Sequence, residues 1–388
     1  MAINSNIYTI LADMVKEEFG ETIEIYDRST FVSAGFKLTA DHTMAELANA
    51  FANNIANKVQ LTLNIVRDYD EYLTFLNAGT LPPGGGLEII NHSFYEARSG
   101  DFANLTDNQS YDMYVVNKGK DFANYYFDSN AYQINITINS REIEGALQSP
   151  EAMSAFYEGK LAYGFNAKRN YSNLMRLGLL AKGFETILTG TYAATPATNQ
   201  MAPARSYPLV TLYNAIHDTS ITAAGCLYDK DFLRFAVGLI NDVRYKMTGY
   251  STAFNPSEKT ATPFGTFTPY SDSRLVVNSV FAENVGSYLH DDSYRDDNDQ
   301  LNYTERVPYW ENAASPLTIE YEASSTQTTS VPIIATVFDR YALMTFDQIN
   351  SVDMTPYNSR GMYSNAWFNY QVGIYQNLDA NQVIFTLS

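Results

Sequence analysis

Residues 149–188 read SPEAMSAFYEGKLAYGFNAKRNYSNLMRLGLLAKGFETIL and carry a helical pattern over their whole length. Ser149 is a preferred N-cap residue type and Pro150 suits the first helical position. About 40 residues that each rise by about 1.5 Å would form a rod of about 60 Å. Apolar residues at helical spacing predict one buried seam, formed by Tyr163, Ala167, Leu174, Leu177, Ala181, Phe184 and Leu188.

The same segment holds two features that qualify a simple rod. Glycines favour a bend or break, and they stand at Gly159, Gly164, Gly178 and Gly183. A group of polar residues indicates that one side of the helix stays in water, namely Asn166, Lys168, Arg169, Asn170 and Asn173.

The C-terminal residues 363–388 alternate in the manner of strands. The first strand has its apolar residues at Phe368, Tyr370, Val372 and Ile374. A turn signal at 377–379 follows, and the second strand has Val383, Phe385 and Leu387. We therefore expect the chain to end inside a sheet.

Other segments have weaker but readable patterns. Thr43 and Glu46 have the spacing of a capping box, which predicts a helix that starts at Thr43. The remaining expected elements are helices over 5–19 and 229–248, strands over 59–65, 317–321 and 331–346, and an apolar segment over 275–285 that could be strand or helix.

Residues 79–86, GTLPPGGG, end any regular element. They lack the Lys and Ser/Thr of a phosphate-binding P-loop, so a hinge or linker is the better interpretation. Residues 87–138 after them are typical of a long β-hairpin, and 132–138 alternate clearly. Because an isolated hairpin is marginal in water, we expect this one to lie on something outside itself.

Composition narrows the function classes. The 388 residues carry a formal net charge of −18, which disfavours electrostatic binding to nucleic-acid phosphates. Only 18% of residues are charged, against about 25% in an average protein, while 30 Tyr and 22 Phe make the chain aromatic. These numbers fit either an aromatic core or a surface that is buried against copies of the same chain.

No catalytic, cofactor-binding or metal-binding residue is predicted. The histidines lack metal-ligand or nucleophile spacing; they are His42, His92, His217 and His290. Cys226 is interpreted as a small buried hydrophobe. The acidic residues of 290–302 fail the EF-hand pattern and are interpreted as a solvated loop. A hydrolase that uses a carboxylate pair therefore has no support, although the composition leaves it open.

The sequence also bears on the compartment. Its start has no basic n-region, and charged residues interrupt any apolar run, so no signal peptide is expected. No stretch approaches the length of a membrane span. A single cysteine forms no disulfide within the chain, which favours reducing, cytosol-like conditions.

The order of these parts resembles the major capsid proteins of tailed bacteriophages, which share the HK-ninety-seven-like fold with herpesvirus shells. In its local sequence pattern, the chain is most similar to the capsid proteins of small short-tailed phages. Two segments carry the resemblance: residues 149–188 look like the spine helix of the family, and IIATVFDRYALMTF followed by WFNYQVGIYQNLDANQVIFTL looks like its passage between domains. The resemblance covers nearly the whole chain but rests on element order, without a specific motif.

The resemblance implies an α+β, HK-ninety-seven-like capsid fold with five parts. They are an N-terminal arm with the start of a peripheral domain (1–83), an extended β-hairpin loop (84–142), the peripheral domain with its spine helix (143–205), an axial domain (206–340) and peripheral-domain return strands (341–388).

The implied function is that of a major capsid protein, not an enzyme, that self-assembles into an icosahedral shell around phage double-stranded DNA. Its partners would be copies of itself in hexamers and pentamers, a portal and the enclosed DNA, without sequence-specific binding, membrane or cofactor. No long charged helical segment precedes the arm, so we expect a separate scaffolding protein. Lys118 and Lys120 have no marked partner, so no cross-link is expected.

The implied location is the virion, after synthesis in the host cytoplasm. The alternative interpretation is a phage-tail or cell-surface β protein that binds carbohydrate through Tyr and Asn.

Overall fold

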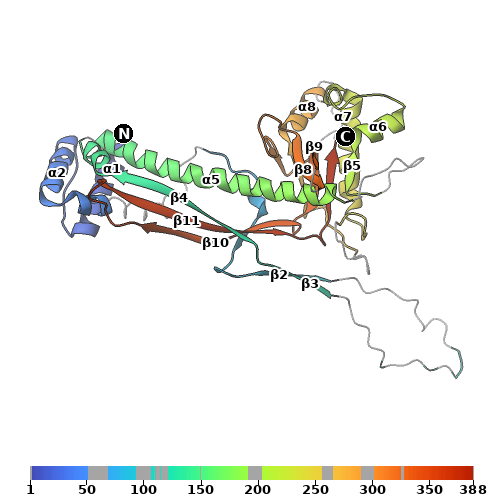
Figure 1. Ribbon diagram of the computed structural model, residues 1–388, viewed down its shortest axis with the longest axis horizontal. Helices are drawn as coiled ribbons and strands as arrows, with labels where there is room; N and C mark the ends of the chain where they lie inside the picture. The colour runs from blue at the N-terminus through green and yellow to red at the C-terminus, as the bar shows by residue number, and fades with distance from the viewer. Residues whose placement is uncertain are drawn as a thin grey trace.

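A computed structural model describes residues 2–50, 69–92, 106–108, 110, 114, 121–148, 150–190, 203–255, 265–289, 301–324 and 327–387. The molecule is elongated (Figure 1). One helix, α5 (Pro150–Leu188), runs along a four-stranded sheet. Short helices gather at its N-terminal end, and a second sheet with its own helices lies at its C-terminal end.

The four-stranded sheet has the order β1-β10-β11-β4. Strand β1 spans Asn77–Thr80 and pairs in parallel with β10, Leu343–Met354. The long strand β11 (Tyr363–Gln376) lies antiparallel to both β10 and β4, the latter spanning Ser129–Asn139. The alternation expected in β11 is confirmed, since its buried residues include Ala366, Phe368, Tyr370 and Val372.

Helix α5 is continuous over 39 residues, and two of its glycines explain how it lies so close to its neighbours. A Cβ atom added at Gly164 would come within 2.9 Å of the side chain of Ile136 in β4. One added at Gly183 would come within 2.5 Å of the side chain of Gln382. These glycines therefore serve close packing, and the helix is not broken at them.

The buried face of α5 differs from the predicted seam. Tyr163 is 78% exposed and Leu174 is 47% exposed, so both point away from the core. Leu177 and Phe184 are buried as expected. The true seam also includes Arg176 and Asn173, the second of which the sequence placed on the wet side. The polar residues are buried because main-chain groups of another segment satisfy them, as described below.

The N-terminal end of the molecule is a small helical core. Helix α1 (Ala2–Phe19) and helix α2 (Arg28–Asp41) pack with α4 (Ser140–Ala146) and with the start of α5. Helix α2 was not expected from the sequence, although Asp27 and Thr30 form a capping box at its start. The predicted capping box of Thr43 and Glu46 is confirmed by hydrogen bonds of 2.9 and 3.4 Å, and residues 44–50 are helical. The strand expected over 59–65 and the N-cap Ser149 lie outside the described residues.

The opposite end contains a six-stranded sheet in the order β5-β12-β9-β6-β7, with β8 paired to β9. The strands span Ser206–Pro208 (β5), Ser273–Asn278 (β6), Glu305–Val307 (β7), Thr318–Ser324 (β8), Gln327–Asp339 (β9) and Gln382–Thr386 (β12).

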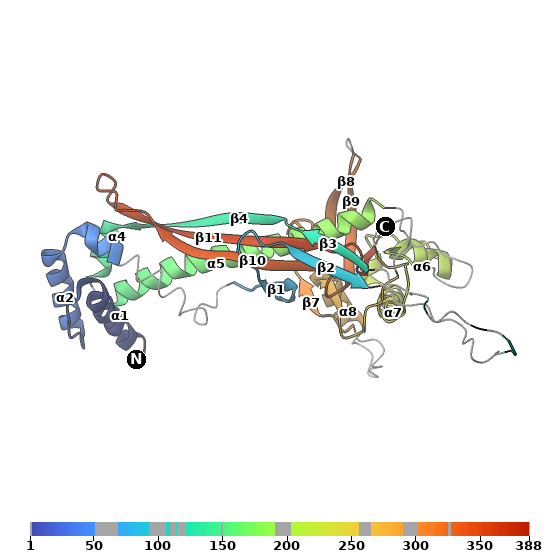
Figure 2. The ribbon, with the colours of Figure 1, turned by 90° about the horizontal axis from the view of Figure 1, so that it is seen from below.

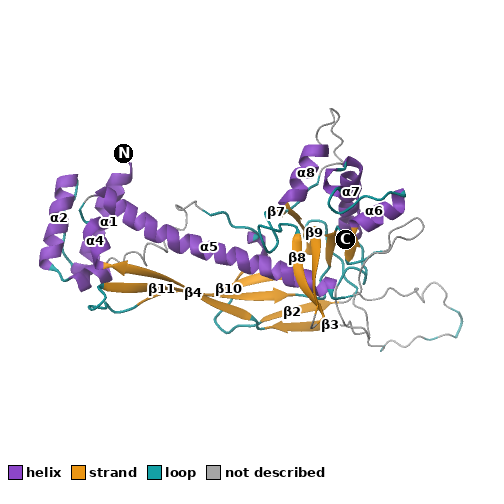
Figure 3. Ribbon diagram, turned by 45° about the horizontal axis from the view of Figure 1, so that its top comes forward, coloured by secondary structure: helices purple, strands orange, loops and turns teal. Residues whose placement is uncertain are grey.

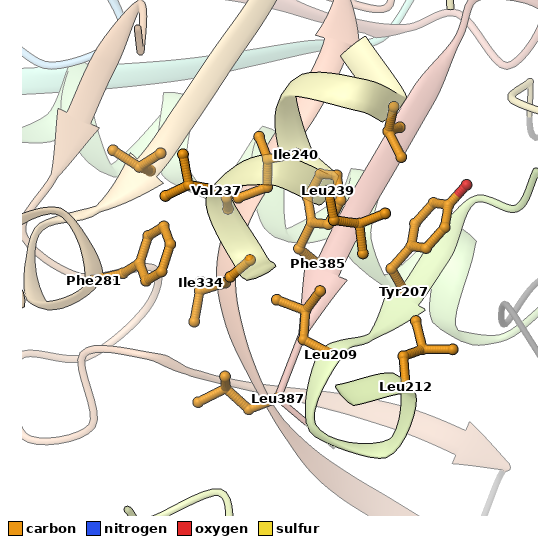
Figure 4. Packing of buried hydrophobic residues seen from close by; sticks show 14 of the residues in the cluster. Tyr207, Leu209, Leu212, Val237, Leu239, Ile240, Phe281, Ile334, Phe385 and Leu387 are labelled. Carbon is orange, nitrogen blue, oxygen red and sulfur yellow. The ribbon is translucent and has the colours of Figure 1, made fainter. Parts of the chain in front are cut away.

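Three helices cover this sheet: α6 (Leu209–His217), α7 (Lys230–Lys246) and α8 (Ser279–Leu289) (Figure 3). Helix α7 matches its prediction, with Asp229 as N-cap accepting a hydrogen bond from the Phe232 amide. The shared core brings Val237 and Ile240 of α7 together with Ile334 of β9 and Phe385 of β12 (Figure 4).

Three expectations about strands need correction. Residues 331–346 are not one strand: β9 ends at Asp339, and β10 starts at Leu343 in the other sheet. Residues 275–285 are a strand that continues directly into a helix, β6 into α8. The closing strand β12 lies between β5 and β9, so the chain ends in the six-stranded sheet and not in the sheet that flanks the long helix.

The predicted long hairpin is also revised. Strand β2 (Leu87–His92) pairs antiparallel with β3 (Asp121–Tyr126) as a separate two-stranded sheet. Strand β4, which the sequence assigned to this hairpin, instead pairs with β11 along its whole length. Within the described part of the chain, the hairpin strands therefore end at Tyr126, short of the predicted boundary at residue 142.

Two leucines of α5 provide a test of this packing. Leu177 is 5% exposed and Leu174 is 47% exposed. Leu177→Asp buries a charge and should lower the free energy of unfolding by several kcal/mol. Leu174→Asp should change it by less than about 1 kcal/mol, because the side chain stays in water. Urea unfolding of both variants compares them, and equal losses would mean that the buried face is misassigned.

Strand β12 provides a second test. Val383, Ile384, Phe385 and Leu387 are all at most 2% exposed. Each such side chain contributes about 1.5–3 kcal/mol, so deleting residues 380–388 removes an amount comparable to the stability of a whole domain. The truncated chain should misfold and aggregate through the exposed edges of β5 and β9. Soluble yield and thermal unfolding measure this, and an unchanged melting transition would contradict it.

Candidate assembly surfaces

The β2–β3 hairpin has two different faces. Its inner face carries Leu87, Ile89 and Tyr126, which pack against Met344, Phe346 and Tyr375 of the four-stranded sheet. The rings of Tyr126 and Tyr375 meet edge to face with centroids 6.0 Å apart. The support that the hairpin needs is therefore supplied, at its root, by its own chain (Figure 2).

The outer face of the hairpin is exposed in the described part of the chain. Ile90 is 50% exposed, Tyr125 is 61% exposed, and Phe127 just beyond β3 is 69% exposed. Two polar pairs flank this apolar strip. The Tyr125 hydroxyl donates to Glu88 Oε1 at 2.7 Å, and the His92 ring lies 2.8 Å from Asp121 Oδ1. A mixed apolar and polar strip of this kind is typical of a surface that becomes buried on association.

Exposed tyrosines are spread over the molecule. They occur between the N-terminal helices α1 and α2, on α5 and around the six-stranded sheet, for example at Tyr26, Tyr163, Tyr228, Tyr245 and Tyr341. Tyrosine also fills cores, as at Tyr207 and Tyr375. The buried tyrosines fit an aromatic core, and the exposed ones are available for contact with copies of the chain.

Beyond the apolar patch that the hairpin covers, the face of the four-stranded sheet that points away from α5 is polar and hydrogen-bonded across strands. Gln133 Nε2 donates to Asn369 Oδ1 at 2.8 Å, and Thr137 Oγ1 donates to Asn365 Oδ1 at 2.8 Å. Around Trp367 this face forms a hollow of about 360 Å³. None of the four strands contains Lys or Arg, so this face offers no cation to a nucleic-acid phosphate.

A strap of residues 69–73 crosses α5 and is held by its polar side chains. Asn173 binds the main chain of the strap through both atoms of its side-chain amide, and we call this pair of bonds the Asn173 clamp. Its Oδ1 accepts a hydrogen bond from the Tyr72 amide at 2.9 Å, and its Nδ2 donates one to the Asp70 carbonyl at 2.8 Å. Arg176 Nη1 donates to Glu71 Oε2 at 3.2 Å and to the Tyr72 carbonyl at 3.0 Å. The strap therefore explains why polar residues lie on the buried face of the helix.

The C-terminal end of the strap is held by the side chain of Glu305. The Leu73 amide donates to Glu305 Oε1 at 2.7 Å, and the Leu73 side chain is fully buried with a φ of 57°. Desolvation by burial raises the pKa of Glu305, and the hydrogen bond from Leu73 partly offsets that rise. The sequence offered no sign of this contact, because the two residues lie 232 positions apart.

Lys168 lies over the Tyr370 ring, 4.5 Å from its centroid, between α5 and the sheet. Desolvation lowers the pKa of Lys168 and raises that of Tyr370 to about 12. Stacking of this kind joins the helix to the sheet and needs no catalytic role to explain it.

The residues weighed for chemistry are separated in space or packed into structure. The His42 ring stacks on Phe19 at 4.0 Å, and the His217 ring lies 4.5 Å from that of Tyr213. Burial raises the pKa of the Cys226 thiol to about 11, so it is protonated at neutral pH. His290 and most of the acidic loop 290–302 lie outside the described residues.

The described residues contain no group of three or more His, Cys, Asp or Glu placed to hold a metal ion. Among their helices, none combines the length and apolarity that a transmembrane span requires.

The architecture defines the class of protein. A spine-like helix on a long sheet, a separate sheet with helices and a projecting hairpin form the α+β, HK-ninety-seven-like fold of phage capsid subunits. Over 84% of this chain and 86% of the other, it is similar to a chain of the Staphylococcus phage Andhra capsid structure, with a TM-score of 0.52 and 11% identity. It is also similar to a chain in the structure of head fiber and inner core protein gp22 of native bacteriophage P68. The TM-score is 0.53 and the sequence identity 11%, over 84% of this chain and 87% of the other.

At a sequence identity of 11%, the structural similarity shows the fold alone. The family is shown by a match of the sequence itself. Residues 11–386 match the model of the Phi29-like phage major capsid protein family, and the chain belongs to that family. It is therefore a major capsid protein that forms the shell of a phage particle together with other copies of the subunit. The search among curated proteins gave no match. The family match confirms the capsid interpretation over that of a carbohydrate-binding β protein.

The Asn173 clamp can be tested against a neighbour on the same helix. Asn173→Ala leaves two partly buried main-chain groups of the strap without partners and should lower the free energy of unfolding by at least about 2 kcal/mol. The control is Asn170, which is exposed and accepts a hydrogen bond from the Tyr69 hydroxyl at 3.2 Å. Asn170→Ala should lower the free energy of unfolding by less than about 0.5 kcal/mol. Denaturant melts compare the two, and similar values would mean that the strap is not held in this way.

Proposed function

We propose that the subunit closes into an icosahedral shell of hexamers and pentamers around double-stranded DNA, and that the β2–β3 hairpin mediates contact with a neighbouring subunit. The observation that carries this proposal is the two-faced hairpin: its inner face rests on its own chain, and its outer apolar strip at Ile90, Tyr125 and Phe127 is exposed. Closed rings of one chain need two different complementary patches, and a projecting hairpin supplies one of them.

The domain division follows the same proposal, with boundaries adjusted to the strands. The peripheral domain comprises α5 with the four-stranded sheet, and the axial domain comprises the six-stranded sheet with α6, α7 and α8. The N-terminal arm contains α1 and α2, and the extended loop starts near Gly84 and includes β2 and β3.

The remaining partners are proposed from the family and from charge. A portal and a separate scaffolding protein would assist assembly, and DNA would be enclosed without sequence-specific contacts. The net charge of −18 and the cation-free sheet face support a shell that does not adhere to its DNA. We propose a structural role without catalysis and synthesis in the host cytoplasm before incorporation into the virion.

Limited proteolysis tests the role of the hairpin. The turn at Gly84–Gly86 leads into β2, and Gly84 is exposed with a φ of 74°. Free subunits should be cut here, whereas assembled particles should be protected, because a neighbour covers the hairpin. Equal cutting of subunits and particles, with particle integrity checked by negative-stain microscopy, would count against the proposal.

Two isoleucines with the same exposure sharpen the test. Ile90 on the hairpin is 50% exposed and Ile216 on α6 is 49% exposed. Neither Ile90→Lys nor Ile216→Lys should shift the thermal unfolding of the free subunit by more than a few degrees, since both side chains face water. Ile90→Lys should nevertheless reduce the yield of particles, because it places a charge in the buried contact. Assembly of this variant at the normal yield would remove the hairpin face from the interface.

A further inference from the structure

The turn between β11 and β12 is one of two short links between the two large sheets; the other is residues 340–342, between β9 and β10. Strand β11 belongs to the four-stranded sheet and β12 to the six-stranded sheet, and only residues 377–381 separate them. Main-chain hydrogen bonds fix this turn: the Asn377 amide donates to the Ala342 carbonyl at 2.7 Å, and the Asp339 amide donates to the Asn381 carbonyl at 2.8 Å. The turn is thus a rigid junction between the two halves of the molecule.

A buried carboxylate in this turn faces the hairpin. Asp379 is 3% exposed. Its Oδ2 accepts a hydrogen bond from Asn124 Nδ2 of β3 at 2.6 Å and a longer one from Asn91 Nδ2 of β2 at 3.3 Å. Next to them, the Tyr126 hydroxyl lies 3.5 Å from Asn377 Oδ1. Burial raises the pKa of Tyr126, and the nearby charge of Asp379 raises it further.

These contacts oppose movement of the hairpin relative to the sheet. The two amides come from different strands of the hairpin and converge on one oxygen of a carboxylate. Lifting the hairpin from the sheet, or sliding β2 against β3, would break at least one of these bonds. Hydrogen bonds to a charged acceptor are stronger than neutral ones, and losing them at a buried site is costly. Asx-rich turns and exposed hairpins are otherwise among the parts of a protein that open most easily.

We propose that Asp379, Asn91 and Asn124 form a clip that holds the root of the hairpin at one angle to the junction of the two sheets. The clip orders the hairpin in the unassembled subunit, so that less conformational freedom is lost when the hairpin meets a neighbour. This second part rests on the proposed contact between the hairpin and a neighbouring subunit. Asn91 and Asn124 act as positioning residues, since they set the direction of the outer face without forming it.

The experiment changes the hairpin side of the clip, because Asp379→Ala alters a buried turn that the fold itself needs. The test variant is Asn91→Ala with Asn124→Ala. The control is His92→Ala, which removes the outward-facing contact with Asp121 from the same hairpin. Hydrogen exchange of peptides from β2 and β3 is measured in unassembled subunits, with peptides from α7 and β9 as internal references. Light scattering then records the rate of particle formation.

The double variant should raise exchange in β2 and β3 by about tenfold or more, since losing a hydrogen bond to a charged group shifts the opening equilibrium by that factor or more. Exchange in α7 and β9 should not change, and assembly should slow in proportion. His92→Ala should leave the exchange of β2 and β3 within about twofold of wild type.

Unchanged exchange in β2 and β3 of the double variant would overturn the clip. Raised exchange with a normal assembly rate would overturn its role in preparing the hairpin for a neighbour. The underlying interface proposal is judged separately on wild-type protein: if assembly adds no protection to β2 and β3, that proposal fails, while the free-subunit exchange still decides whether the clip exists.

Discussion

The structure depends on one constraint, which is that a single 39-residue helix contributes to cores at both of its ends. Met153 and Phe165 of α5 belong to the N-terminal helical core, whereas Phe184 and Ile187 belong to the core beneath the six-stranded sheet. Between them the helix lies on the four-stranded sheet, where Lys168 stacks on a tyrosine ring. Strand β10 also reaches both ends, since Leu343 belongs to the second core and Met354 packs against the first. The helix and this strand together set the distance between the two ends.

The parts that could be predicted from the sequence are those in which a helical or strand pattern of apolar residues repeats several times along the chain. The helix over 150–188, helix α7 and the alternation in β11 each repeat the same pattern over several turns or residue pairs. The capping box at Thr43 was readable because both of its partners lie within one turn. The HK-ninety-seven-like fold and the capsid function followed from the order of these elements, through resemblance to a family.

The parts that could not be predicted depend on distant partners. Strand β12 has the pattern of an ordinary strand, and only its pairing with β9 and β5 assigns it to the six-stranded sheet. Asn173 is polar and therefore looked exposed, but the strap supplies both of its hydrogen-bond partners from about 100 residues earlier. The Asp379 contacts were missed for the same reason, since their partners lie more than 250 residues away.

Shape links these contacts to assembly. The chain exposes 21632 Å², whereas a compact monomer of the same mass would expose about 15,000 Å². A rod-like subunit therefore has several small cores and a large surface, and it gains more than a compact one from burying surface against neighbours. That gain requires projecting parts to be held in place before contact, because each freely moving segment adds an entropic cost. The junction turn at 377–381 meets this need, since it joins the two sheets through five residues and holds the hairpin through Asp379.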